Sequence, residues 1–272
     1  MTQLDSDARS AGSPPRFVDT HCHLDDQAFA ADLDDVLARS RQAGVTHWIN
    51  VGFNPDRWAG SIVLAERYAG MDFMLGVHPG DASCWTGSVP SDLERTIAVS
   101  RPVAIGEIGL DFFRGETNVH QQVQAFNDQL DLAMVANLPV VIHMRDAERQ
   151  VLETLSARRE LPRLLFHSFD GSTSLTDWVI ASGAFVGVGG LATRSKSTAL
   201  REQLARLPID RLVLETDSPY LVPNGFKHRR NTPESIPRIA TMLGTLLDRP
   251  LADIAAHTTA NAGRFFERPL AR

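Results

Sequence analysis

The sequence predicts an α/β protein with the TIM (β/α)8 barrel fold. Its 272 residues, 43% of them hydrophobic, can bury one large core, and barrels of this class need about 250 residues. Short apolar runs alternate with longer stretches of helical spacing along the whole chain, which is typical of parallel strands joined by helices. A doubly wound open sheet usually carries a glycine-rich phosphate turn after an early strand, and histidines stand there instead. The open sheet is therefore disfavoured.

Eight apolar or β-branched runs are expected to be the strands. In chain order they cover residues 17–18, 46–51, 73–77, 103–108, 139–142, 164–166, 184–188 and 212–214. Between them, the segment 119–136 places Val123, Phe126 and Leu130 on one stripe of a helix. Thr232 with Pro233 after it is typical of a helix start, and the segment 251–266 also has helical spacing.

We expect two parts along the chain: a flexible N-terminal tail at residues 1–15 and a single hydrolase barrel at 16–272. The tail is polar and lacks the apolar segment of a secretory signal, and no stretch approaches the roughly 18 apolar residues of a membrane span. Only Cys22 and Cys84 could form a disulfide. A soluble, cytoplasmic protein is expected, with no membrane partner and with a monomer as the default state. The net charge of −6 argues against a surface that is basic throughout, but it does not exclude a local basic patch.

Residues of metal-binding types stand at the ends of the predicted strands. The strands of a parallel barrel all point the same way, so their carboxyl ends meet at one rim, where barrel enzymes place their active sites. His21 and His23 leave the same face of the first strand, whereas Cys22 between them faces the surrounding helices. The whole set is His21, His23, His78, Glu107, His143, His167 and Asp217. We expect these residues to converge on one site.

The composition of this set predicts two divalent metal ions. A single catalytic zinc usually has three protein ligands, and four of these five histidines together with the two carboxylates already exceed that number. Glu107 is expected to bridge the ions. Asp217 is expected to bind one of them and to accept a proton from the attacking water, so Glu107 and Asp217 are the predicted catalytic residues. Zinc, manganese and magnesium all remain open as the metal.

Several strings in the chain resemble one known family. They are VDTHCHLD (18–25), GVHP (76–79), IGEIGLDF (105–112), VIHMRDA (141–147), FHSFDGS (166–172), ETDSPYLVP (215–223) and RRNTP (229–233). The His-x-His pattern is shared with many amidohydrolases, but the strings around Glu107 and Asp217 are much more specific. In their order and spacing, from residue 17 to 266, they resemble the TatD family of metal-dependent deoxyribonucleases.

The resemblance implies a deoxyribonuclease that hydrolyses phosphodiester bonds with a water activated by two metals, on single-stranded DNA or 3′ ends. The implied metal ligands are His21, His23, Glu107, His143, His167 and Asp217, and every position is filled. His78 is implied to lie beside the metals and to contact substrate. Gly80 stands where relatives commonly carry a second histidine, so a substrate contact at that point is not expected here.

Basic residues in the loops of the expected rim favour a substrate that carries phosphate groups. They are Arg145, Arg194, Lys196, Lys227, His228, Arg229 and Arg230. Arg145, two residues after His143, is the preferred substrate-binding residue, and Arg229 is the next. Asp111 and Asp146 also follow predicted strands and could orient histidines, although capping a helix is the simpler role for Asp146.

Two other functions remain open. A metal-dependent deacylase or amidohydrolase would use the same centre on an ester or amide. The branch of amidohydrolases that needs a carboxylated lysine at the end of a central strand is disfavoured, because the only lysines, Lys196 and Lys227, lie in expected loops. A non-catalytic barrel should lack some of the ligands, and none is missing. The choice between DNA and RNA and between exonuclease and endonuclease action depends on loop shape.

Overall fold

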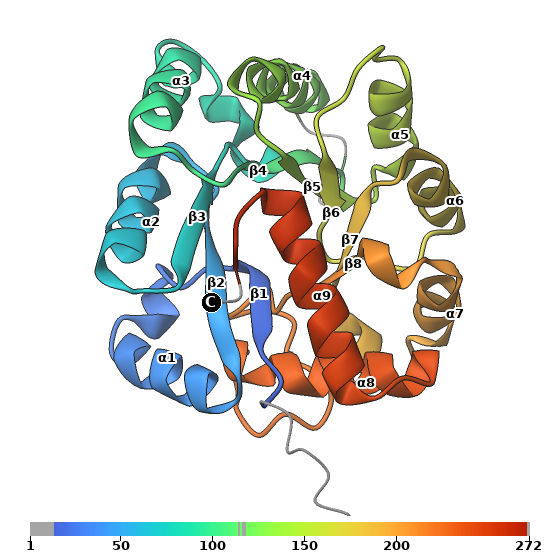
Figure 1. The fold of residues 1–272 in the computed structure, drawn as a ribbon. Helices are drawn as coiled ribbons and strands as arrows, with labels where there is room; N and C mark the ends of the chain where they lie inside the picture. The colour runs from blue at the N-terminus through green and yellow to red at the C-terminus, as the bar shows by residue number, and fades with distance from the viewer. Residues whose placement is uncertain (1–13, 114, 116–117, 271–272) are drawn as a thin grey trace, which may run out of the picture.

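The fold is a (β/α)8 barrel, as the sequence predicts. The computed structural model describes residues 14–113, 115 and 118–270. Its strands form one sheet in the order β1 to β8, and each strand pairs in parallel with the next (Figure 1). They are β1 (Phe17–Cys22), β2 (Val45–Gly52), β3 (Met71–Leu75), β4 (Ala104–Asp111), β5 (Val140–Arg145), β6 (Leu164–Phe166), β7 (Phe185–Val188) and β8 (Leu212–Leu214). Each predicted run overlaps one strand.

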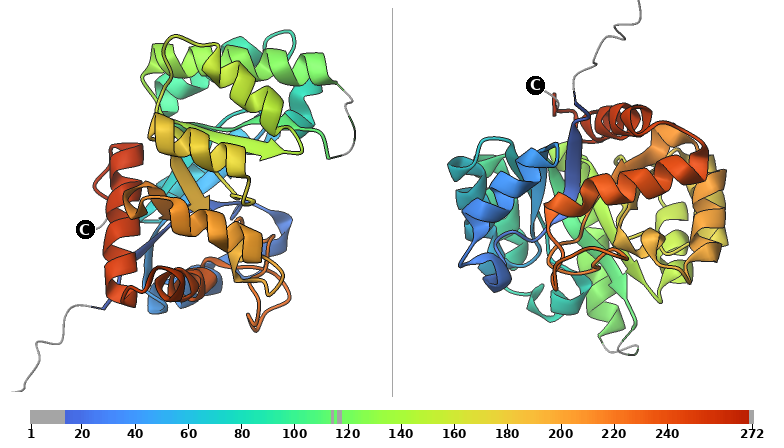
Figure 2. Two further views of the ribbon diagram at one scale, coloured as in Figure 1. Left: turned by 90° about the vertical axis from the view of Figure 1, so that its right-hand side faces the viewer. Right: turned by 90° about the horizontal axis from the view of Figure 1, so that it is seen from below.

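Helices surround the sheet (Figure 2). The α-helices are α1 (Leu33–Gln42), α2 (Pro55–Arg67), α3 (Val89–Ser100), α4 (Val119–Ala136), α5 (Glu148–Ser156), α6 (Thr173–Ser182), α7 (Thr198–Arg206), α8 (Ile236–Leu247) and α9 (Leu251–Phe266). The 3-10 helices are η1 (Gln27–Phe29), η2 (Pro79–Cys84), η3 (Gly190–Thr193), η4 (Ile209–Arg211) and η5 (Pro233–Ser235). The predicted stripe of α4 is confirmed, because Phe126 and Leu130 are buried. Thr232 precedes η5, which leads into α8, and Asp146 does not cap α5, whose N-cap is Ala147.

The barrel closes where β1 meets the segment after β8. Cys22 and Ser218 form a parallel bridge, and the amide of Asp217 donates to the carbonyl of His21 at 2.9 Å. Next to this bridge, the buried carboxylate of Asp19 accepts two hydrogen bonds from Thr216, one from the backbone N at 2.9 Å and one from Oγ1 at 2.6 Å. These bonds join the first and last strands, and they fix the positions of the residues at the strand ends.

The barrel interior is filled with apolar side chains and is closed at one end by α9, which crosses in front of the strands in Figure 1. Val51, Met74 and Val141 of the strands pack in one cluster with Phe265 and Phe266 of α9. Burial of each such side chain contributes about 1.5–3 kcal/mol. The side chains of α9 also hydrogen-bond to the starts of β1 and β8: Thr259 Oγ1 donates to the carbonyl of Arg16, and Asn261 Nδ2 donates to that of Leu212. Helix α9 therefore covers the amino ends of the strands.

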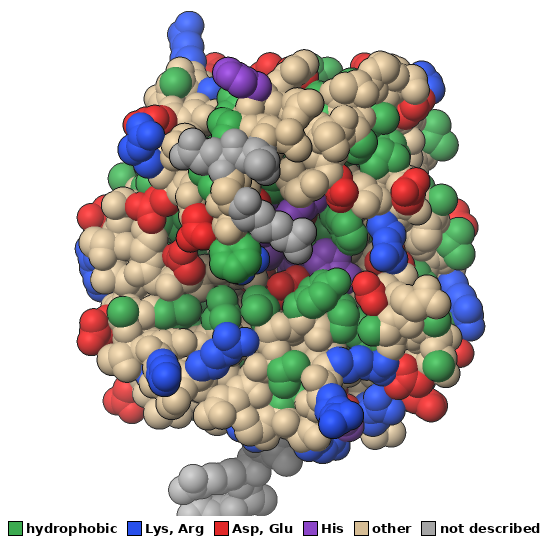
Figure 3. Space-filling view, turned by 180° about the vertical axis from the view of Figure 1, so that it is seen from behind, with side chains coloured by type: hydrophobic (Ala, Val, Ile, Leu, Met, Phe, Trp, Pro, Cys, Tyr) green, Lys and Arg blue, Asp and Glu red, His purple; other side chains and the backbone are tan. Residues whose placement is uncertain are grey.

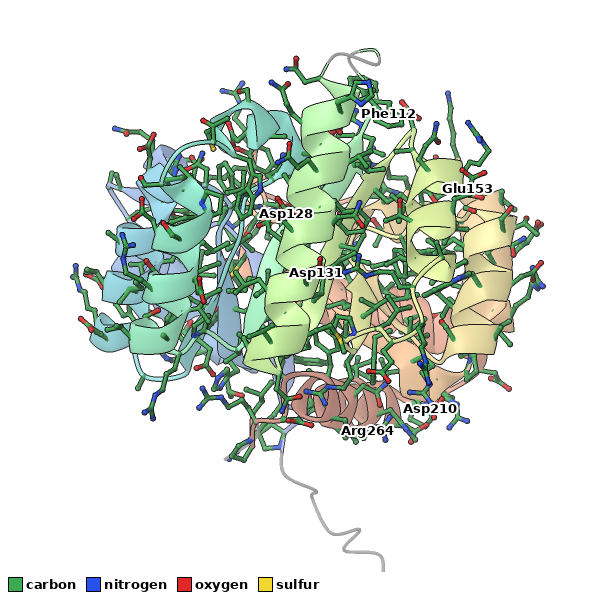
Figure 4. The ribbon with its side chains drawn as sticks, turned by 90° about the horizontal axis from the view of Figure 1, so that it is seen from above. Phe112, Asp128, Asp131, Glu153, Asp210 and Arg264 are labelled. Atoms are coloured by element: carbon green, nitrogen blue, oxygen red, sulfur yellow. The ribbon has the colours of Figure 1, made fainter. Side chains whose placement is uncertain are left out.

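The two ends of the barrel are seen in Figure 4, where Phe112, directly after β4, lies at one end and Asp210 and Arg264 lie at the other. Arg264 Nη2 donates to the carbonyl of Asp210 at 2.7 Å, which adds to the contacts of α9. In this fold the amino end contributes stability and the carboxyl end carries the chemistry. The site must therefore be sought at the end that α9 leaves open.

Three further expectations concern the N-terminal tail, the two cysteines and membrane spans. The predicted tail at 1–15 lies outside the described residues except for Pro14 and Pro15. Cys22 and Cys84 are free thiols, and Cys22 is packed in the cluster between sheet and helices, as expected. In the described part of the chain, no helix combines the length and apolar character that crossing a bilayer requires.

Candidate metal centre

The predicted strand-end residues converge at the open end of the barrel. His21 and His23 come from the end of β1, Glu107 from β4, His143 from β5 and His167 directly follows β6. Asp217 lies three residues after β8. Figure 3 shows histidine side chains at the bottom of a hollow on this face, with acidic side chains beside them and hydrophobic side chains along the edge.

Glu107 lies at the middle of the cluster. Its Oε1 is 2.7 Å from His143 Nδ1 and 2.6 Å from His167 Nε2. Its Oε2 faces the other side, 3.4 Å from His21 Nε2. The two oxygens of Glu107 thus face different histidines: Oε1 faces His143 and His167, and Oε2 faces His21.

Asp217 lies close to both histidines at the end of β1. Its Oδ1 lies 3.2 Å from His23 Nε2 and 3.8 Å from His21 Nε2. The donor atoms of His21, His23 and Asp217 lie close enough together to hold one cation, and so do those of Glu107, His143 and His167. All six predicted ligands are therefore divided between two adjacent groups of three.

A buried nitrogen in these groups supports a metal rather than a network of hydrogen bonds. Among the described residues, Nε2 of His21, which faces both Glu107 and Asp217, is buried without a hydrogen-bond partner. A buried polar atom without a partner costs about 1–3 kcal/mol, so such atoms are rare unless another species completes them. Imidazole nitrogens and carboxylate oxygens are the donors that zinc and manganese accept. The residues present therefore fit a divalent cation.

The electrostatic environment favours the charged form of Glu107 and disfavours the charged forms of His21 and His78. Burial alone would raise the pKa of Glu107, but His167, His78 and His21 hold that pKa well below its usual range. Burial, helped by the neighbouring His167, lowers the pKa of His21 to about 4, and burial lowers that of His78 to about 3. A charged carboxylate and a neutral imidazole are the forms that bind metals.

His78 lies beside the cluster, as predicted. Its Nε2 is 3.7 Å from Glu107 Oε1, and its ring centroid is 4.3 Å from that of His143. Gly80 donates its backbone N–H to His78 Nδ1 at 2.9 Å. A Cβ at position 80 would lie 3.0 Å from the same nitrogen, so the glycine lets the backbone approach the ring closely.

Asp111, considered in the sequence as a residue that orients a histidine, does contact one. Its Oδ2 lies 3.0 Å from His143 Nε2, on the opposite side of the ring from Glu107. Burial alone would lower the pKa of His143, but its hydrogen bonds to Asp111 and Glu107 raise that pKa to about 9. The ring orientation of His143 is thus fixed from both sides.

Two glutamines of α4 hold the strand ends, which the sequence did not indicate. Gln129 binds both the N–H and the carbonyl of Val77, at 2.7 and 3.1 Å, next to His78. Gln122 binds the N–H and the carbonyl of Asp111 in the same way, at 2.9 and 3.0 Å. One helix therefore positions the ends of β3 and β4.

Glu215 is a candidate ligand that the sequence reading missed. It is fully buried, and its Oε2 has no hydrogen-bond partner among the described residues, while its Oε1 accepts a hydrogen bond from the N–H of Ser168. Its carboxylate, His21 and His167 form another group that could hold a cation. Burial raises the pKa of Glu215 to about 8. The available signal is its place directly after the last predicted strand, two residues before Asp217.

The predicted substrate-binding arginines lie in different places. Arg145, at the end of β5, is exposed, and its guanidinium lies 3.4 Å from the ring centroid of Phe113. Arg229 is exposed in the loop after β8 and lines a cavity of about 410 Å³ with Arg39, His228 and Arg230. In the part of the chain that the structure describes, no contact joins Arg229 to the histidine cluster. The substrate roles of both arginines stay predictions.

Residues 18–267 match the family model described as TatD related DNase. The chain is 35% identical over 257 residues to the 3′-5′ ssDNA/RNA exonuclease TatD of Erwinia tasmaniensis, which covers 91% of this chain and 98% of the relative. It is 34% identical to the uncharacterized metal-dependent hydrolase YjjV of Escherichia coli K12, over 93% of this chain and 99% of the relative.

Solved structures agree with these matches. The crystal structure of YjjV from Escherichia coli K12 superposes with a TM-score of 0.88 at 34% identity, over 94% of this chain and 99% of that one. A TatD family hydrolase from Entamoeba histolytica gives a TM-score of 0.80 at 21% identity, over 92% of this chain and 98% of that one. At that lower identity the likeness concerns the fold alone.

Proposed function

The chain belongs to the TatD family of metal-dependent hydrolases, and from this we propose that it is a deoxyribonuclease that cleaves phosphodiester bonds of DNA. The family assignment rests on a match across residues 18–267 and on relatives at about a third identity over nearly their full length. The observation that carries the proposal further is the position of Glu107, whose two oxygens face two separate groups of ligands.

We propose that two divalent ions bind at this centre. The residues that would hold them are His21, His23, Glu107, His143, His167 and Asp217. When bound, such ions polarise phosphoryl oxygens and lower the pKa of water toward neutrality. The mixture of nitrogen and oxygen donors favours zinc or manganese over magnesium, which prefers oxygen ligands.

In this proposal the side chains divide the work of hydrolysis. Asp217 takes the proton from the water that attacks phosphorus, because its carboxylate lies within the cluster, with Oδ1 3.2 Å from His23 Nε2. Arg145 binds the phosphate group of the substrate, since it is exposed and two residues after His143. His78 lies against Glu107 and contacts the substrate beside the ions.

The form of the substrate and the extent of the domain belong to the same proposal. The relatives named as exonucleases act on single-stranded DNA and RNA from the 3′ end, and we propose single-stranded or 3′-terminal DNA for this chain. We also propose that residues 16–272 act as one hydrolase domain, because the sheet runs unbroken from β1 to β8. The cytoplasmic location and the monomeric state remain predictions. No specific observation favours the deacylase or amidohydrolase alternative, whose solved examples share only the fold.

The test is hydrolysis of end-labelled single-stranded DNA by protein treated with a chelator and then supplied with zinc, manganese or magnesium. We expect cleavage that needs the metal and is lost in Asp217→Asn and Glu107→Gln. Asp131→Asn is the matched control, because this exposed carboxylate lies on α4 in the outer layer of helices (Figure 4). Metal binding without cleavage of DNA or RNA under any ion would overturn the proposal, and a panel of esters and amides would then test the alternative.

A further inference from the structure

Two exposed aromatic rings border the candidate metal centre. Of the aromatic side chains that the structure describes, only Phe113 and Tyr220 are more than half exposed, at 56% and 53%. Elsewhere in the described chain the aromatic residues are buried or partly buried. Aromatic side chains contribute much of the binding energy at interfaces, and an exposed ring beside a functional site is well placed to contact a substrate. That both exposed rings lie next to the same cluster calls for a common explanation.

Phe113 is held on the β4 side of the centre. Its backbone N–H donates to Asp111 Oδ1 at 2.9 Å, and the other oxygen of Asp111 contacts His143. The guanidinium of Arg145 lies 3.4 Å from the ring centroid of Phe113 and supports one face of it. Arg145 has no ion pair with a carboxylate among the described residues. Phe113 thus combines an exposed ring with an adjacent unpaired cation.

Tyr220 is held on the β8 side. Its backbone N–H donates to the carbonyl of Asp217 at 2.8 Å, so it is fixed to a proposed ligand. Its ring centroid lies 5.9 Å from that of His23 in an edge-to-face arrangement, and His23 packs in the same way on Phe53 at 5.4 Å. The loop that carries Tyr220 is itself anchored, because Asn231 Nδ2 donates to the carbonyls of Thr216 and Leu221.

The two rings lie on opposite sides of the mouth. Strands β4 and β8 are separated by four positions in the eight-stranded order, which is half of the way around the barrel. Phe113 follows β4 and Tyr220 follows β8, while the ligands from β1, β5 and β6 lie between them. A chain that passes over the centre therefore meets one ring before the ligands and the other ring after them.

We propose that Phe113 and Tyr220 stack on the nucleobases that flank the scissile phosphate, and that they make the enzyme select single-stranded nucleic acid. The inference rests on the proposed nuclease function. Every base has an aromatic face, so stacking tolerates any sequence and is worth about 1–3 kcal/mol per base. In a duplex the base faces are covered by their neighbours, and only an unpaired strand offers them to both rings. Arg145 beside Phe113 binds the phosphate next to the stacked base.

The experiment compares two oligodeoxynucleotides of the same length, one with normal bases and one with abasic residues on both sides of the linkage to be cut. We measure KM and kcat with manganese for the wild type, Tyr220→Leu, Tyr220→Phe and Phe113→Leu. Tyr68→Leu is the control, because this tyrosine caps α2 in the outer layer and bonds to Asp34. Circular dichroism verifies that each variant is folded.

We expect the two leucine variants to raise KM for the normal oligonucleotide by about tenfold and to leave kcat and the KM for the abasic one unchanged. Tyr220→Phe should retain the wild-type KM because it keeps the ring. A wild type that cuts both oligonucleotides with the same KM overturns the stacking proposal while the nuclease function stands. Equal losses on both oligonucleotides also overturn it, and they would assign the rings to the fold or to a protein partner. A wild type that cuts neither overturns the proposed function itself.

Discussion

The carboxylate of Asp111 holds the imidazole of His143 from the side, with Oδ2 at 3.0 Å from Nε2. The other ring nitrogen, Nδ1, faces Glu107 at 2.7 Å. A carboxylate that accepts a hydrogen bond from a metal-binding histidine fixes the ring and makes its other nitrogen a stronger metal ligand. Removal of such a partner costs about 10- to 100-fold in metal affinity. Through this contact Asp111 would influence the affinity of the proposed metal centre.

Asp111→Asn should therefore weaken metal binding by about 10- to 100-fold without loss of the fold. The asparagine keeps the shape of the side chain but removes its charge. Titration calorimetry with zinc or manganese measures the affinity. Asp131→Asn, on the outer face of α4, should bind metal like the wild type. Equal affinities in Asp111→Asn and the wild type would show that the contact does not support the centre.

Removal of metal should lower thermal stability while the secondary structure stays intact. The barrel core packs without the site residues, so far-UV circular dichroism should not change with a chelator. Metal at about 100 times its Kd should add about 2.7 kcal/mol, which raises Tm by several degrees. His23→Gln should lose this increase, whereas His47→Gln, whose histidine pairs with Asp72 outside the site, should keep it. The same rise in both variants would contradict the assignment of the ligands.

Gly187→Ala should disturb the centre through Glu215. A Cβ at position 187 would lie 2.0 Å from Glu215 Oε2, and the side chain of Glu215 is fully buried. Overpacking of this kind costs about 1–3 kcal/mol, and we also expect weaker metal binding. Gly60→Ala on α2 is the control, because its nearest contact is 3.9 Å away and alanine favours a helix. Urea unfolding compares the free energies of unfolding of the two variants. A Gly187→Ala variant as stable as the wild type would refute the close approach of position 187 to Glu215.

Asp19→Ala should destabilise the seam between β1 and β8. The change leaves the N–H and the hydroxyl of Thr216 buried without their acceptor, and each loss costs about 1–3 kcal/mol. Asp19→Asn keeps an acceptor for the N–H and should be milder. Denaturant unfolding in the presence of a chelator isolates this effect from metal binding. An Asp19→Ala variant as stable as the wild type would mean that the hydrogen bonds to Thr216 contribute nothing.

Glu234→Gln should lower stability at neutral pH and have little effect in acid. Burial would raise the pKa of Glu234, but Lys227 and Arg39 together lower it below the usual value. A carboxylate whose pKa is depressed in the folded state stabilises the protein above its unfolded pKa, and this contribution disappears as pH falls through the folded pKa. We expect a difference of about 1 kcal/mol at pH 7, since the partners are partly exposed.

The measurement for Glu234 is thermal unfolding of wild type and variant from pH 7 to pH 3 with a chelator present. The difference in Tm between the wild type and the variant should disappear over the acidic part of this range. A difference that stays constant with pH would show that the ion pairs with Arg39 and Lys227 do not stabilise the fold.

Much of the architecture could be predicted because it depends on local pattern. The runs of β-branched residues mark the strands, and a parallel barrel brings their carboxyl ends to one rim. The convergence of the six predicted ligands at that rim follows from these two facts, whereas Glu215 was not among them. The period of two along a strand correctly placed Cys22 away from His21. The rule does not reach Glu215 and Asp217, because β8 ends at Leu214 and the backbone at Asp217 has a φ of 55°.

Other features depend on side-chain direction, which the sequence pattern does not contain. The amide groups of Gln122 and Gln129 could have pointed to water, but the structure turns them to the backbone at the ends of β4 and β3. Arg145 and Arg229 are alike in the sequence, yet only Arg145 reaches a residue beside the cluster. The loop after β8 is long enough to carry Arg229 elsewhere.

The helix that closes the amino end of the barrel makes the catalytic hollow a blind pit. Phe265 and Phe266 of α9 seal the bottom, and the strand interior above them is packed with apolar side chains. A polymer cannot thread through such a barrel as it does through a ring. In a nuclease of this shape the nucleic-acid substrate enters and the released nucleotide leaves through the same opening. Both therefore pass the side chains of Phe113 and Tyr220.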